Sequence, residues 1–189
     1  MWRSRTQSSR GRATGPRRCA YARGMPIPEF VAALRSHVGT DLLWMPGVSA
    51  VVVDDDGRVL LGQRADTGQW AVISGILEPG EDPAVGLARE VLEETGVEVG
   101  VDALVAVTVT EPVRYPNGDL SQYLDLAFVC RPVSPVAAAA AHVADDESLA
   151  VSWFAPDALP DDLARSTTER LAHARRWLDD PSAGPFFVR

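Results

Sequence analysis

The segment from residue 75 to residue 97 constrains this chain more than any other, because its residues define both ends of one helix. Asp82 suits the N-cap, where its side chain can accept from the first backbone N–H groups. Pro83 fits the first helical position, where a missing N–H costs nothing. Gly96 suits the left-handed position that ends a helix. These residues predict a helix over about residues 83 to 95.

The predicted helix has two chemically different sides, as its rotation of about 100° per residue shows. One side carries the carboxylates of Glu90, Glu93 and Glu94. The other side is largely aliphatic and should be buried. Its members are Ala84, Leu87, Ala88, Val91 and Thr95.

Clustered carboxylates on a helix indicate a cation. Glu90, Glu93 and Glu94 would repel one another by roughly a few tenths of a kcal/mol per pair, and a divalent cation removes this repulsion. Carboxylate oxygens are preferred ligands of Mg²⁺, which keeps positions for waters and substrate phosphates. We therefore expect these glutamates to bind Mg²⁺ or Mn²⁺. Glu81 lies just before the helix and could reach the same cluster. Arg89 either holds a glutamate in place or contacts a phosphate.

The spacing of the whole segment resembles the Nudix box. That motif reads G-x5-E-x7-R-E-U-x-E-E-x-G-U, where U is a bulky aliphatic residue, and this chain matches every specified position. The resemblance to the Nudix hydrolase domain covers roughly residues 45 to 165. The matching residues are Gly75, Glu81, Arg89, Glu90, Val91, Glu93, Glu94, Gly96 and Val97.

The resemblance implies hydrolysis of a nucleoside diphosphate linked to another moiety. It implies catalytic roles for Glu81, Arg89, Glu90 and Glu93, and metal ligation by Glu90, Glu93 and Glu94. The general base stays open between Glu81, Glu90 and a loop acid. ADP-ribose, a nucleotide sugar, an oxidised dNTP and CDP-alcohols all remain candidate substrates. The box glycines with structural roles are Gly75, Gly80 and Gly96.

The segment before the box departs from the family pattern. Relatives commonly have Trp-x-x-Pro-Gly-Gly here, whereas this chain has Ser74 and Ile76 on either side of Gly75. The resemblance implies that the backbone carbonyl of Ser74 is a further metal ligand. A carbonyl survives any change of side chain, so this role is retained while the shape of the pocket changes.

Residues outside the box supply further candidates. Relatives often draw an additional carboxylate from a loop before a late strand containing Trp, and Asp145-Asp146-Glu147 precedes Trp153 in a comparable place. We expect Glu147 to be a metal ligand; the alternative is a solvated acidic loop. The candidate substrate contacts are Arg64, Tyr115 and Asp119, although Asn-Gly-Asp at residues 117 to 119 is first of all turn chemistry.

Charge is unevenly distributed along the chain. The first 24 residues hold seven of the 18 arginines and none of the 26 acidic residues, so the remainder carries 11 basic and 26 acidic residues. This acidic part has no basic stripe for duplex nucleic acid. No apolar run approaches the length of a membrane span. Cys19 and Cys130 have no metal-site spacing and predict no disulfide, which fits the cytoplasm. A homodimer stays an open alternative.

The chain divides into four segments. Residues 1–24 are expected to be a disordered arginine-rich tail, either a transit-like segment or, as we prefer, an over-extended gene start with translation beginning at Met25. Residues 25–44 form an N-terminal helix and linker, residues 45–180 the Nudix domain with its C-terminal helix, and residues 181–189 a tail.

The order of predicted elements indicates an α/β fold, a Nudix-type α/β/α sandwich around a mixed β-sheet. Residues 48–53 and 59–64 predict a hairpin, because Asp54 to Gly57 is a turn signal. Further strands are predicted over 104–110, 123–130 and 151–154, and helices over 28–38 and 167–178.

Two other activities fit such a fold. One is a non-hydrolytic nucleotide sensor, which would tolerate damaged glutamates and usually carries a DNA-binding partner domain. The other is an isomerase of isoprenoid diphosphates, which needs catalytic cysteine and glutamate contexts that we do not find in this sequence.

Overall fold

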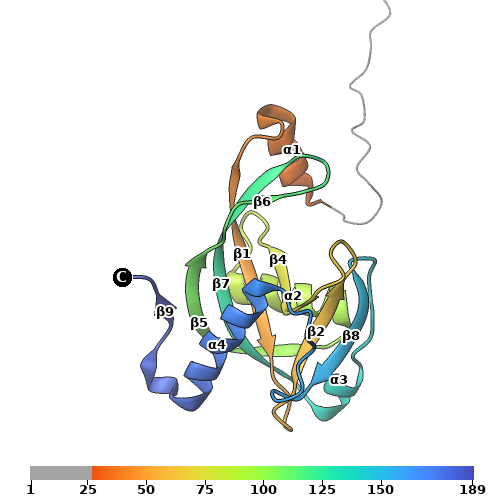
Figure 1. Cartoon of the computed structure of the whole chain (residues 1–189), viewed down its shortest axis with the longest axis vertical. Coiled ribbons are helices and arrows are strands. Elements are labelled where there is room, and N and C mark those ends of the chain that lie inside the picture. Colours follow the sequence, from red (N-terminus) through yellow and green to blue (C-terminus); the bar gives the residue numbers. More distant parts are fainter. Residues whose placement is uncertain (1–26) are drawn as a thin grey trace, which may run out of the picture.

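The computed structural model describes residues 27–189 (Figure 1). The predictions for the arginine-rich tail and for a start at Met25 lie outside these residues. The helices are α1 (Glu29–Val38), α2 (Pro83–Thr95), α3 (Pro135–Ala139), α4 (Arg165–Asp179) and the short 3-10 helix η1 (Pro181–Ala183). The strands are β1 (Leu43–Val52), β2 (Val59–Arg64), β3 (Trp70–Ala71), β4 (Ile73–Ile76), β5 (Val99–Val109), β6 (Val113–Arg114), β7 (Leu120–Pro132), β8 (Ser148–Phe154) and β9 (Phe186–Phe187).

The strands form two sheets. The larger is mixed and has the order β4-β1-β7-β5-β9, with β6 paired to β7. Within it β1 runs parallel to β7 and antiparallel to β4. The smaller sheet is antiparallel and has the order β3-β2-β8. The predicted mixed sheet between helices is confirmed, with the smaller sheet as an addition.

The predicted hairpin of β1 and β2 is wrong. The two strands belong to different sheets and share a single bridge, between Val53 and Val59. The reason lies in burial: the last six residues of β1, from Gly47 to Val52, are all buried. A strand of this kind lies inside a sheet and is apolar on both faces, so β1 takes β4 and β7 as its neighbours, while β2 pairs with β3 and β8.

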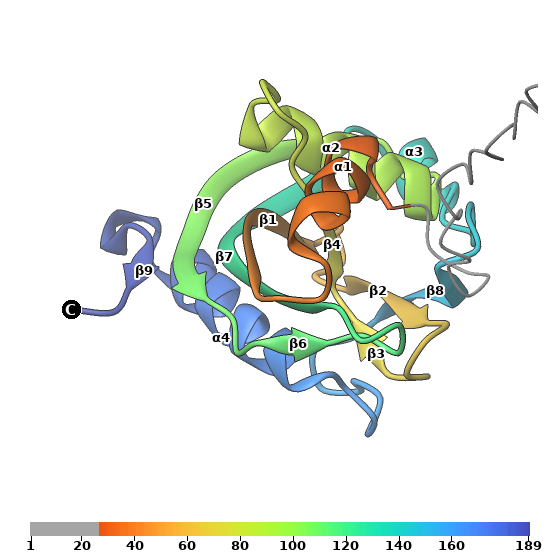
Figure 2. The same ribbon diagram turned by 90° about the horizontal axis from the view of Figure 1, so that it is seen from above.

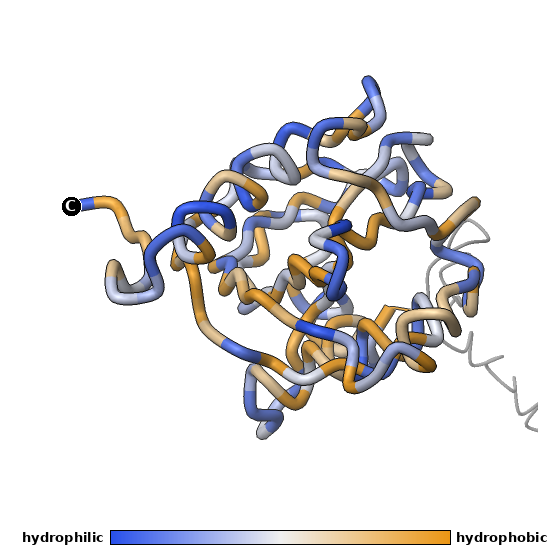
Figure 3. Tube along the Cα trace, turned by 90° about the horizontal axis from the view of Figure 1, so that it is seen from below, coloured by the Kyte–Doolittle hydropathy of each residue, from blue (hydrophilic) through white to orange (hydrophobic). Residues whose placement is uncertain are grey.

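Helices cover both faces of the mixed sheet, and Figure 2 shows α2 and α4 on opposite sides of β1 and β7. On the α2 side, Leu87 and Val91 pack with even-numbered residues of β1 such as Val48 and Ala50. On the α4 side, Ala174 packs with odd-numbered residues such as Val51. The most hydrophobic stretches of the trace accordingly follow the strands (Figure 3).

The C-terminal residues join the fold instead of forming a separate tail. After η1, strand β9 pairs in parallel with β5 through Ala106 and Phe186. The ring of Phe186 also stacks on His173 of α4, with ring centroids 4.3 Å apart. Within residues 27–189, no helix is both long enough and apolar enough to cross a membrane.

A buried polar cluster ties α4 to the centre of the mixed sheet. Asp125 of β7 accepts hydrogen bonds from Ser49 Oγ at 2.7 Å and from Arg170 Nε at 2.8 Å. The side chains of Arg170 and Asp125 are only 13% and 6% exposed. Breaking a buried ion pair is costly because it leaves one charge without compensation.

Asp125→Ala should therefore lower the free energy of unfolding by about 3 kcal/mol, since Arg170 would stay buried without its partner. Urea unfolding measures the change. The double variant Asp125→Ala with Arg170→Met should recover part of the loss. A loss below about 1 kcal/mol in the single variant would contradict a stabilising role for this pair.

Candidate active site

The helix that carries the carboxylates begins and ends where the sequence predicts. Helix α2 has Pro83 in its first turn, and Gly96 adopts a left-handed conformation with φ of 69°. The N–H of Gly96 donates to the carbonyl of Leu92 at 2.9 Å, which closes the last turn. Asp82 occupies the N-cap position in an extended conformation, but its side chain makes no capping hydrogen bond. The capping role predicted for the Asp82 side chain is therefore wrong.

Arg89 connects three carboxylates of the box. Its Nε and Nη2 donate to the two oxygens of Glu81 at 2.9 and 3.0 Å. Its Nη1 donates to Glu93 Oε2 at 2.9 Å, and Nη2 lies 3.1 Å from Glu90 Oε1. The guanidinium lowers the pKa of the Glu81 carboxyl. Arg89 thus holds glutamates in place, which is one of the two roles left open by the sequence.

Two glycines leave room for these carboxylates. A Cβ atom at Gly75 would collide with the side chain of Glu90, and one at Gly86 would come within 2.6 Å of Glu81 Oε2. Gly75 therefore lets Glu90 lie directly against strand β4. Gly86 is buried within α2, and the space beside it is filled by Glu81 and Leu77. The glycine in the middle of the helix thus makes room for a box carboxylate.

Glu90 and Glu94 are half-buried and electrostatically coupled to Glu147, whereas the side chain of Glu93 is 58% exposed. Burial, together with the charges of Glu147, Glu90 and Asp145, raises the pKa of Glu94 to about 9. Burial and neighbouring carboxylates also raise the pKa of Glu147 to about 7. The structure thus brings the acidic loop next to the carboxylate side of α2.

Backbone hydrogen bonds fasten this acidic loop. The N–H of His142 donates to the Thr95 carbonyl at 3.0 Å, and the N–H of Ala144 donates to the Glu94 carbonyl at 3.2 Å. On the other side, the N–H of Ala65 donates to the carbonyl of Glu147 at 2.8 Å. The loop therefore lies between the C-terminal end of α2 and the end of β2.

Arg64, at the end of β2, is a second cation of the site besides Arg89, which contacts Glu90. Its charge opposes the rise in the pKa of Glu94 and of Glu147. Its Nε and Nη2 donate to both carboxylate oxygens of Asp66, at 2.9 and 2.7 Å. Sequence reasoning did not single out Asp66, although an acid two residues after an arginine at a strand end is a detectable signal.

Tyr115 lies near enough to Arg64 for the arginine charge to act on its phenol. Burial and Tyr123 raise the pKa of the Tyr115 phenol, while the nearby Arg64 charge opposes that rise. The hydroxyl groups of Tyr115 and Tyr123 lie 2.9 Å apart. The third predicted substrate contact is used differently: Asp119 Oδ2 accepts from Asn117 Nδ2 at 2.9 Å and lies 3.5 Å from Arg35 Nε. We therefore reassign Asp119 from substrate contact to the anchoring of the hairpin formed by β6 and β7.

The carbonyl of Ser74 points away from β1. The N–H of Leu77 donates to the Pro46 carbonyl, so these two opposite residues form a hydrogen-bonded pair. The next pair, Gly47 and Ile76, therefore has no mutual hydrogen bonds. Pairs with and without mutual hydrogen bonds alternate along an antiparallel ladder. Ser49 and Ser74 therefore form a second pair without them, and the Ser74 carbonyl is turned away from β1. Because β4 is an edge strand of the mixed sheet, this carbonyl lies at its open side.

These donors are chemically suited to a hard divalent cation. Glu90, Glu94 and Glu147 supply half-buried carboxylates whose mutual repulsion a cation would remove. In the part of the chain that the structure describes, no three such side chains already converge on one point as a complete metal site. These donors fit such an ion because all are carboxylate oxygens and because their charges act on one another.

Fold and site together define an α/β protein with a glutamate-rich helix held against a mixed sheet. The model of the NUDIX domain family matches residues 43–178. The chain therefore belongs to the Nudix family of hydrolases.

Individual relatives agree with this family. A MutT-like protein of Streptomyces ambofaciens is 40% identical over 127 residues, which are 67% of this chain and 74% of that protein. An RNA pyrophosphohydrolase of Rickettsia canadensis (strain McKiel) is 37% identical over 70 residues, 36% of this chain and 42% of that protein. The crystal structure of a MutT NUDIX hydrolase from Burkholderia pseudomallei matches with a TM-score of 0.54 and 25% identity, covering 69% of this chain and 98% of its own.

The raised pKa of Glu94 predicts how the metal-free protein responds to pH. A carboxyl whose folded-state pKa is about 9, against an ordinary 4.5, binds its proton more tightly when folded. The free energy of unfolding should therefore fall as the pH rises from about 4.5 towards 9. Glu94→Gln should flatten this slope, measured by urea unfolding in EDTA. Glu93→Gln is the exposed control, and an unchanged slope in Glu94→Gln would contradict the burial of its charge.

Proposed function

We propose that this chain hydrolyses the diphosphate bond of a nucleoside diphosphate linked to another moiety, with a divalent cation, Mg²⁺ or Mn²⁺, as cofactor. The observation that carries the proposal is that Glu90, Glu94 and Glu147 are half-buried and act on one another electrostatically, while a backbone hydrogen bond from Ala144 to Glu94 joins the acidic loop to α2. Without a bound cation, half-buried carboxylates that repel one another lower the stability of the folded protein. They are useful where a cation and a phosphate group meet.

The cation would be held by Glu90, Glu94 and Glu147, with the Ser74 carbonyl and the exposed Glu93 as additional donors. When bound, it supplies charge neutralisation for the diphosphate and for the attacking water. Arg89 holds the box glutamates in place, and Arg64 is the proposed contact of the substrate phosphates. Tyr115 is the proposed contact of the nucleoside part.

The contacts of Glu81 support a narrower choice of general base than the one that the sequence left open. Both oxygens of Glu81 accept hydrogen bonds from Arg89, and Glu81 also accepts from the N–H of Glu78 at 3.1 Å. We therefore assign Glu81 to the support of the box loop. Glu90 and the acidic loop remain the candidates that would accept the proton of the attacking water.

Removal of the divalent cation should abolish turnover. The experiment offers the full chain a panel of ADP-ribose, a nucleotide sugar, an oxidised dNTP, a CDP-alcohol and an RNA oligonucleotide with a 5′-triphosphate. It measures the released products by chromatography with Mg²⁺, with Mn²⁺, and in excess EDTA. Activity retained in EDTA would contradict the cofactor. Tight binding of one compound without its turnover would support the sensor alternative instead.

The role of Glu94 in turnover is tested separately. Glu94→Gln keeps the shape of the side chain and removes the charge, so kcat should fall by at least about 10²-fold, the scale of losing a charge-stabilising group. Far-UV circular dichroism checks that the fold is kept. A variant with kcat within about 3-fold of wild type would contradict the assignment of Glu94.

The acidic loop is tested by replacing Asp145, Asp146 and Glu147 with Asn, Asn and Gln. If the loop supplies a ligand or the base, kcat should fall by about 10-fold or more, and the Mg²⁺ concentration for half-maximal activity should rise. The backbone hydrogen bonds of His142, Ala144 and Ala65 do not depend on these side chains, and Asp145→Asn keeps an oxygen that can accept from the N–H of residue 147. The melting temperature should therefore not fall. Unchanged kcat and Mg²⁺ dependence would make the loop a solvated surface.

A further inference from the structure

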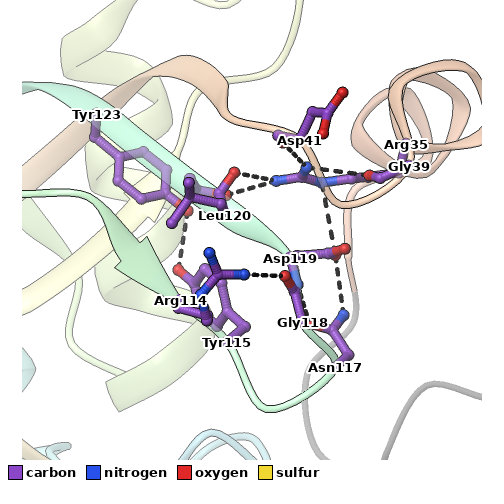
Figure 4. Close-up of polar contacts among 11 residues, drawn as sticks. Arg35, Gly39, Asp41, Arg114, Tyr115, Asn117, Gly118, Asp119, Leu120 and Tyr123 are labelled. Carbon is purple, nitrogen blue, oxygen red and sulfur yellow. Dashed lines mark hydrogen bonds and ion pairs between the residues drawn. The ribbon is translucent and has the colours of Figure 1, made fainter.

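The hairpin that carries Tyr115 is attached to α1 by one buried arginine (Figure 4). Arg35 Nη2 donates to the Leu120 carbonyl and to Ser121 Oγ, both at 2.8 Å. Its Nη1 donates to the carbonyls of Asp41 and Gly39, at 2.6 and 3.2 Å. One guanidinium therefore links the end of α1 to the start of β7.

Arg35 is deeply buried for a charged residue. Its side chain is 5% exposed, and Nε lies 3.5 Å from the Asp119 carboxylate, which is itself 12% exposed. The buried residues of α1 are Val31 and Arg35, whereas Leu34 is 42% exposed. Placing a cation on the buried side of a short helix is costly unless it is fully hydrogen-bonded. The planar fork of arginine meets this condition here.

The contacts of Arg35 lead directly to Tyr115. Asp119 is fixed by Arg35, and its carbonyl accepts from the N–H of Tyr115 at 2.9 Å. The hydroxyl oxygens of Tyr115 and Tyr123 lie 2.9 Å apart, and the charge of Arg64 is near enough to act on the pKa of the Tyr115 phenol. Leu120 also donates to the Thr40 carbonyl at 3.2 Å, so loss of Arg35 would loosen the hairpin without releasing it.

We propose that Arg35 is a positioning residue, which fixes the β6–β7 hairpin through Asp119, Leu120 and Ser121 and thereby holds Tyr115 beside Arg64 to bind substrate. This rests on the proposed function only in its second half, since the fixing of the hairpin can be measured without substrate. Arg35 acts at a distance from the carboxylate cluster, so it should govern substrate affinity more than the chemical step.

The first test is kinetic and uses the panel compound that the wild type hydrolyses best. Arg35→Met should raise KM by about 5- to 10-fold, the scale of re-ordering a few side chains on binding, with kcat within about 2-fold of wild type. Arg170→Met is the matched control, because it also removes a buried arginine from an ion pair but leaves the hairpin contacts intact. The control should keep the wild-type KM.

A double variant asks whether Arg35 acts through Tyr115. In a Tyr115→Ala background, Arg35→Met should change KM by less than about 2-fold, since the group that it positions is already absent. Arg35→Lys should resemble Arg35→Met, because one ammonium cannot serve the acceptors on both sides of the guanidinium. If Arg35→Met does not fold, two other variants test the same contacts. Asp119→Asn removes the charge that faces Arg35, Ser121→Ala removes one acceptor, and both should raise KM.

The second test is amide hydrogen exchange over residues 113–123 in the substrate-free protein. Faster exchange in Arg35→Met, with unchanged exchange in Arg170→Met, supports the fixing of the hairpin, and this holds even if no panel compound is hydrolysed. Unchanged exchange in Arg35→Met overturns it. Faster exchange with an unchanged KM, or an equal loss of kcat and kcat/KM, overturns the positioning of Tyr115 for substrate.

Discussion

The packing of α2 against the mixed sheet determines where each carboxylate of the site lies. Leu87 and Val91 are fully buried against β1, and each contributes about 2 kcal/mol through burial. Glu90 and Glu94 lie along one edge of this aliphatic stripe and are half-buried, whereas the side chain of Glu93 lies further round the helix and is 58% exposed. An apolar contact thus sets the solvation of the polar groups, and with it their chemistry.

The carboxylates of the site repel one another, and the arginines of the protein compensate this repulsion only in part. Arg89 compensates Glu81, Glu90 and Glu93 by direct contacts. The pKa of Glu94 is nevertheless raised to about 9 by burial and by neighbouring carboxylates, and Arg64, which opposes this, is itself held by Asp66. Conflicts of this kind are expected where function overrides stability. The conflict is confined to the edge of α2 that faces the acidic loop.

Features that depend on neighbouring residues in the chain could be predicted from the sequence. Features that depend on pairing between distant segments could not. Pro83 and Gly96 give the bounds of α2 because caps act within one turn, and the strand over 59–64 is β2 as predicted. The neighbours of β1 could not be predicted, since a strand buried on both faces accepts many partners. The same holds for Arg35 and Asp119, whose pairing joins distant segments. Each residue alone resembles an ordinary surface charge.

The fastening of the acidic loop shows how a local rule and a distant pairing combine. The last carbonyls of a helix have no partner within it. In α2 those of Glu94 and Thr95 accept from Ala144 and His142 of the acidic loop. The side chain of Glu94 therefore belongs to the carboxylate cluster, while its backbone carbonyl binds the loop that carries Glu147. Because the spacing of the two acids rests on backbone hydrogen bonds, their repulsion cannot simply move them apart. The folded protein instead raises the pKa of Glu94 to about 9 and that of Glu147 to about 7, and a bound cation can relieve the same repulsion.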